Sequence, residues 1–134
     1  MSDKFEMVKQ FLFDMELPIV SEDSAEALVV VDDEENGIKH LVIDCEDPIL
    51  VLEQLIMKTP KNPGELYKRL LQMNRSLVHG AFVLNEDGES ILFRDTLQLE
   101  NLDRNELEAS IHSLSLALAE YSSELLKYAE KVFD

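Results

Sequence analysis

The carboxyl-terminal third of the chain carries an apolar stripe that predicts one long helix. Its apolar residues recur at alternating spacings of four and three, the repeat of one helix face. Asp103 and Glu106 form a capping-box signature at its start, and no Gly or Pro interrupts the run, so we expect about 30 residues, or roughly 45 Å of helix. To bury its stripe, such a helix must cross a sheet or contact a partner. The stripe consists of Leu107, Ile111, Leu114, Leu118, Tyr121, Leu125, Tyr128 and Val132.

A second apolar stripe, near the amino terminus, predicts a first helix. Asp3 is expected to cap this helix with Glu6 three residues later, and Pro18 is expected to end it. Met7 and Phe11 widen the apolar arc to roughly 160°, beyond the arc of about 100° that packing on a sheet requires. The stripe consists of Phe5, Val8, Leu12 and Met15.

Three strands are predicted between the first helix and the middle of the chain. The β-branched runs 27–31 and 38–43 flank Asn36-Gly37, a dipeptide typical of a type I′ hairpin turn because both residues tolerate a positive φ. The apolar run 49–57 lies between prolines and fits a strand that passes through the interior of the sheet.

A middle helix and a second hairpin complete the predicted elements. Asn62, Pro63 and Glu65 favour a helix start, and the helix would bury Leu66, Leu70 and Met73. The runs 80–84 and 90–93 flank the turn 85–88. With 134 residues we expect one domain, 1–134, with an α+β fold in which helices pack on an antiparallel sheet in the order α-β-β-β-α-β-β-α.

The formal charge of -16 disfavours binding to nucleic acid or to an anionic membrane. The exception to this acidity is the segment 58–75, with five basic residues and one acidic one. The amino terminus lacks an apolar signal core, and the lone cysteine forms no intrachain disulfide, so we expect a cytoplasmic protein. The charge also leaves open an alternative function, an acidic regulator that mimics nucleic acid and occupies a basic site on its partner.

No pattern in the chain points to catalysis or to a cofactor. His40, His79 and His112 lie too far apart in the sequence for a helical metal-ligand pair, and no P-loop, nucleophile elbow or dinucleotide fingerprint occurs. Cys45 lies among carboxylates, which raise the pKa of a thiol. We therefore predict a protein that is not an enzyme, with no catalytic residues, no metal and no cofactor.

The order of elements, the chain length and the acidity resemble those of the class I chaperones of type III secretion, the CesT/Tir type, and of the YbjN-like family. The resemblance rests most on the stretch from His79 through the strand 91–97 to Asn101-Leu102-Asp103, which leads into the long helix. It implies a homodimer that holds an extended or partly unfolded segment of a client protein, without catalytic residues.

Apolar residues in excess of what packing requires are the candidates for binding. On the first helix, Phe13 points away from the stripe and its flanks. The candidate partner-binding residues are Phe5, Met7, Phe11, Met15 and Leu116, the last lying opposite the stripe of the long helix. The candidate dimer-interface residues lie on the middle helix or on an edge strand and are Tyr67, Leu71, Ile91 and Phe93.

Overall fold

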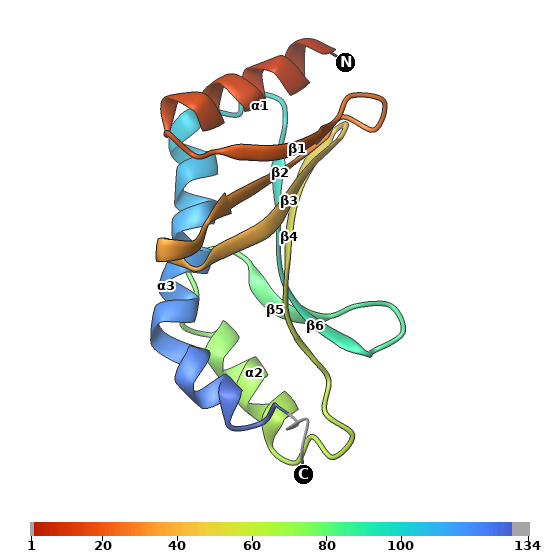
Figure 1. The fold of residues 1–134 in the computed structure, drawn as a ribbon, viewed down its shortest axis with the longest axis vertical. Helices are drawn as coiled ribbons and strands as arrows, with labels where there is room; N and C mark the ends of the chain where they lie inside the picture. Colours follow the sequence, from red (N-terminus) through yellow and green to blue (C-terminus); the bar gives the residue numbers. More distant parts are fainter. Residues whose placement is uncertain (1, 130–134) are drawn as a thin grey trace.

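The computed structural model describes residues 2–129 and shows three α-helices packed on one face of a six-stranded antiparallel sheet (Figure 1). The strands lie in the order β1-β2-β3-β4-β6-β5. The elements, in chain order, are α1 (Ser2–Asp14), β1 (Ile19–Asp23), β2 (Leu28–Asp33), the short 3-10 helix η1 (Glu34–Asn36), β3 (Ile38–Glu46), β4 (Ile49–Lys58), α2 (Leu66–Asn74), β5 (Ala81–Leu84), β6 (Ser90–Gln98) and α3 (Arg104–Leu126).

Two apolar clusters lie between the helices and the sheet, and α3 contributes to both. The first joins α1 and the amino-terminal half of α3 to strands β2 to β4 and to Phe93 of β6, with Leu12, Val29 and Leu107 among its fully buried residues. The second joins α2 and the carboxyl-terminal half of α3 to β5 and β6, with Leu70 and Leu125 among its residues. The predicted stripe of α3 therefore spans the sheet, as its length requires.

The predicted start of α3 is confirmed, but the helix is shorter than expected. Asp103 accepts a hydrogen bond from the Glu106 backbone N–H at 2.8 Å, and the Glu106 carboxylate accepts one from the Asp103 N–H. The helix ends at Leu126, and Tyr128 lies in a turn beyond it. Val132 lies outside the described residues.

The predicted fold class and the strand 49–57 are confirmed, and the structure adds one strand. β1 pairs with β2 at the edge of the sheet, and most of its side chains are exposed. Its residues Ser21-Glu22-Asp23 carry no alternation of apolar and polar side chains, so the pattern on which strand prediction depends is absent.

Three predicted element ends differ in the structure. Helix α1 already includes Asp3, which lies in its first turn rather than at the cap. The turn before β3 is the helix η1 followed by Gly37 at φ 80°, and Asn36 does not share the positive φ of a type I′ turn. Gly64 adopts φ 56°, which no α-helical residue adopts, so α2 begins at Leu66 instead of Pro63.

The end of α3 offers a matched pair of leucines that tests whether its stripe holds the second cluster. Leu125 is buried in that cluster, whereas the neighbouring Leu126 is 72% exposed. Leu125→Ala is expected to lower the free energy of unfolding by about 2–5 kcal/mol, and Leu126→Ala by no more than about 0.5 kcal/mol. Urea denaturation measures both, and equal losses would contradict the assignment of the core.

Candidate protein-binding surfaces

The stripe of α1 faces the core, and this limits which of its residues are available to a partner. Phe5 is buried with Val8 and Leu12, so its ring belongs to the core instead of an accessible surface. Met7, Phe11 and Met15 are partly buried and pack against the same cluster. The wide apolar arc of α1 is therefore mostly covered.

Phe13 is the exposed aromatic residue of α1, with 76% of its surface accessible. The helix ends just beyond it, and Glu16 adopts a left-handed conformation with φ 59° that turns the chain toward β1. The Leu17 N–H donates to the Leu12 carbonyl at 3.0 Å and closes this turn. In the sequence, Phe13 already differs from the other apolar residues of the first helix because its spacing places it away from the apolar stripe.

A hollow of about 590 Å³ lies at the junction of α1 and β1. Phe13, Leu17 and Ile19 supply apolar surface, and Asp14 and Glu16 supply carboxylates. Strand β1 continues from the hollow, and as an edge strand it has a neighbour on one side only. Apolar surface, acidic groups and a free strand edge thus lie together at this end of the sheet.

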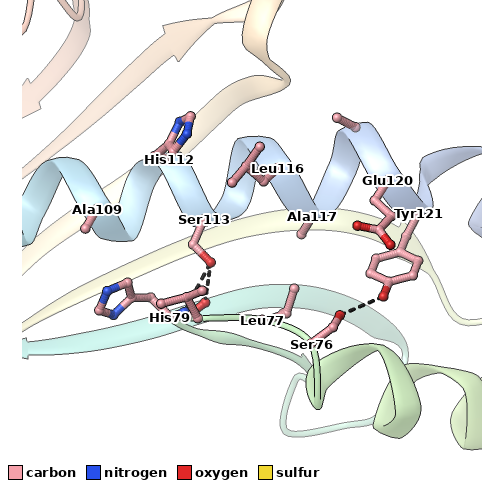
Figure 2. A pocket seen from close by; sticks show the side chains of 12 residues that line it. Ser76, Leu77, His79, Ala109, His112, Ser113, Leu116, Ala117, Glu120 and Tyr121 are labelled. Atoms are coloured by element: carbon pink, nitrogen blue, oxygen red, sulfur yellow. Dashed lines mark hydrogen bonds between the residues drawn. The ribbon is translucent and has the colours of Figure 1, made fainter.

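A second hollow, of about 520 Å³, lies between α3 and the loop 76–79 that joins α2 to β5 (Figure 2). Leu116 of α3 is 55% exposed and Val78 of the loop 83% exposed, and both line it. The His79 and His112 side chains also line it, whereas His40 lies on β3, so the structure brings two of the three histidines to one surface. Among residues 2–129, no group of three or more metal-binding side chains is present.

The predicted dimer-interface residues fall into an exposed pair and a buried pair. On α2, Leu71 is 73% exposed and Tyr67 is also exposed. Ile91 and Phe93 are buried, and their strand β6 lies between β4 and β5, so the prediction that they form an exposed edge is wrong. The Phe93 ring packs edge-on against Phe82, with ring centroids 6.4 Å apart.

The sequence model of the CesT_Tir_1 family matches residues 1–131. The chain belongs to the CesT_Tir_1 family. The predicted resemblance to type III secretion chaperones and to YbjN is therefore confirmed. No curated protein matches the chain in sequence.

Solved structures share the fold of this CesT_Tir_1 member at low sequence identity. YbjN from E. coli is 14% identical, with a TM-score of 0.67, over 90% of this chain and 92% of YbjN. A chain of the HopA1-SchA chaperone-effector complex is 16% identical, with a TM-score of 0.66, over 91% of this chain and 96% of that one. A chain of the ExsC-ExsE complex is 22% identical, with a TM-score of 0.63, over 93% and 94%. Within residues 2–129, no helix has the length and apolar character needed to span a membrane.

The face of the sheet opposite the helices carries a group of carboxylates. Asp44 is opposite Leu28 and Val51 on the neighbouring strands, and Glu53 forms an ion pair with Arg94. Burial, and then the neighbouring Glu46 carboxylate, raise the pKa of Asp44 to about 6.

Cys45 is a poor nucleophile in this environment. Its side chain is half-buried, and burial followed by the charges of Asp44 and Asp47 raises the pKa of its thiol to about 11. The thiol form therefore predominates at neutral pH, and only the thiolate is an effective nucleophile. This upward shift of the thiol pKa agrees with the shift expected from the carboxylates around Cys45 in the sequence.

The raised pKa of Asp44 predicts a pH dependence of stability. The folded protein retains a proton that the unfolded chain releases between about pH 4 and pH 6, so the free energy of unfolding falls as the pH rises through this range. Asp44→Asn removes this effect. The variant should exceed the wild type in stability at pH 7.5 by no more than about 2 kcal/mol, because solvent screens part of the interaction, and should match it at pH 4.

Urea denaturation at both pH values measures the effect of Asp44→Asn. Glu86→Gln, in the exposed turn between β5 and β6, is the control and should change stability by less than about 0.5 kcal/mol at each pH. A stabilisation by Asp44→Asn that is the same at pH 4 and pH 7.5 would contradict the assigned pKa.

Proposed function

We propose that this protein is a non-enzymatic binding module that holds an extended segment of another protein at the junction of α1 and β1, as a cytoplasmic chaperone. The observation that carries the proposal is the exposed Phe13 ring at a hollow beside the edge strand β1. Membership of the CesT_Tir_1 family supports it, as does the shared fold with a protein of the HopA1-SchA chaperone-effector complex.

The α1–β1 junction combines two ways of binding an extended segment. The unpaired backbone groups of an edge strand accept an added strand through main-chain hydrogen bonds, and a pocket beside the edge selects its side chains. Phe13, Leu17 and Ile19 would contact an apolar side chain of the client. Met15 packs against the first cluster and lines an adjoining hollow together with Leu17, where its flexible side chain could adapt to different clients.

Phe13→Ser tests this surface, with Leu126→Ser as its control because the two residues are almost equally exposed, at 76% and 72%. The wild-type protein, used as bait in extracts of its native cells, first recovers a partner, which is then purified. Phe13→Ser should weaken the affinity for this partner about tenfold or more, as expected for an aromatic hot spot, and leave the urea midpoint nearly unchanged. Leu126→Ser should alter neither.

Measuring the affinity for the partner at low and at high salt separates apolar docking from the alternative, an acidic regulator that mimics nucleic acid. Binding that depends on Phe13 should persist at high salt, because apolar contacts are not screened. Binding that is insensitive to Phe13→Ser and collapses at high salt would contradict the proposal and favour an acidic regulator.

We further propose that the protein is a homodimer that pairs through the exposed face of α2. Leu71 and Tyr67 are exposed there, and both lie in the basic segment 58–75 of an otherwise acidic chain. An interface at this helix would cover apolar side chains that the second cluster leaves accessible. It would also keep the strongly acidic parts of the two copies apart.

Sedimentation equilibrium tests the dimer directly. The wild type should sediment at twice 15.3 kDa at micromolar concentration, and Leu71→Asp should sediment at 15.3 kDa while remaining folded. Asp at an apolar interface leaves a buried unpaired charge, which is strongly unfavourable. A wild type that sediments only as a 15.3 kDa species would contradict the dimer, and a Leu71→Asp variant that remains dimeric would contradict the choice of α2.

A further inference from the structure

We propose that the groove between α3 and the loop 76–79 is a second binding site, for a protein segment that combines an apolar side chain with lysine or arginine. It goes beyond the function proposed above because it concerns a different surface, formed by elements that do not contribute to the α1–β1 junction. Figure 2 shows the groove, with α3 on one side and the loop on the other.

Hydrogen bonds fix the loop to α3, so the groove is already formed without a partner. The Ser113 hydroxyl is buried, donates to the His79 carbonyl at 2.8 Å and accepts from the His79 N–H at 3.2 Å. The Ser76 and Tyr121 hydroxyls are hydrogen-bonded at 2.6 Å at the other end of the loop. A preformed groove avoids part of the entropic cost of binding, because little of the site has to be ordered.

Part of the apolar surface of the groove comes from residues that the core does not use. Leu116 is absent from both apolar clusters, and so is Val78. Single exposed apolar residues are ordinary on a protein surface. Here two of them come from segments far apart in the sequence and line the same hollow, together with Ala109 and Ala119. A hollow of about 520 Å³ is large enough for one or two side chains of a partner.

The charge around the groove selects the kind of segment that fits. Glu120 lines the groove, and Glu108 lies beside Ala109 and His112 in an adjoining hollow. No lysine or arginine is present among the lining residues. A cationic side chain would find carboxylates next to apolar surface, where water screens their attraction less than in bulk solution. An acidic segment, including the acidic parts of a second copy of this chain, would meet like charge from Glu120 and Glu108 at the groove.

Two synthetic peptides test the proposal by fluorescence polarisation with the full-length protein. Both carry the same leucines, and the remaining positions are arginine in one peptide and glutamate in the other. The leucine-arginine peptide should bind at least about tenfold more tightly than the leucine-glutamate peptide. An acidic protein attracts any cationic peptide. Matched variants are therefore needed to distinguish binding at the groove from nonspecific electrostatic attraction to the rest of the protein.

The variant Leu116→Ser is compared with the control Leu55→Ser, because the two leucines are almost equally exposed, at 55% and 58%. Leu55 lies on β4, on the face of the sheet opposite the helices. Glu120→Gln and its control Glu86→Gln each remove one exposed carboxylate. Leu116→Ser should weaken binding of the leucine-arginine peptide about tenfold, and Glu120→Gln several-fold, whereas both controls should change it less than about twofold. Val78→Ser gives an independent second test of the apolar contact.

The experiment also distinguishes a wrong proposal for the groove from a wrong proposal for the α1–β1 junction. Phe13→Ser should leave binding of the leucine-arginine peptide unchanged, since Phe13 does not line the groove. Equal binding of the two peptides, equal losses in Leu116→Ser and Leu55→Ser, or full affinity in both Leu116→Ser and Val78→Ser would each overturn the proposal.

Discussion

The packing of α3 against both apolar clusters is the interaction on which the rest of the structure depends. Leu107 and Leu114 belong to the first cluster, and Ala117 and Leu125 belong to the second. The sheet bends between the two, and neither α1 nor α2 is long enough to reach both (Figure 1). One helix with an uninterrupted apolar stripe therefore joins the two ends of the sheet into a single body. Arg69 adds a charged link between α2 and α3 by pairing with Glu124.

Because the core uses the stripes of the helices, the apolar side chains that remain accessible on the helices lie outside these stripes. Phe13 on α1, Leu71 on α2 and Leu116 on α3 are each exposed, and each lies off the buried face of its helix. Core packing does not require these three side chains. They lie on three different helices, and each belongs to a different proposed surface: the α1–β1 junction, the face of α2 and the groove beside the loop 76–79. A small acidic body with several separate apolar contacts suits a protein that holds a partner without chemically changing it.

The sequence predicted those elements whose side chains carry a clear period, and it failed where structure depends on neighbours. The stripe of α3 and the buried face of α2 follow from spacing alone. Strand β1 has no such pattern, because only its pairing with β2 makes it a strand. The prediction that Ile91 and Phe93 lie at an edge is wrong because the order of strands in the sheet, with β5 outside β6, is not encoded in the spacing of apolar residues along either strand. The groove beside Leu116 likewise depends on the loop 76–79, which hydrogen bonds to Ser113 bring against α3.

Site-specific photo-cross-linking in the native cells tests most directly whether the protein holds a client at the α1–β1 junction. A benzophenone amino acid replaces Phe13 in one strain and Glu86, in an exposed turn at the far end of the sheet, in another. The account predicts one dominant adduct at position 13, formed with the same partner that the wild type recovers, and no such adduct at position 86. Equal adducts at both positions, or none with that partner at position 13, would contradict it.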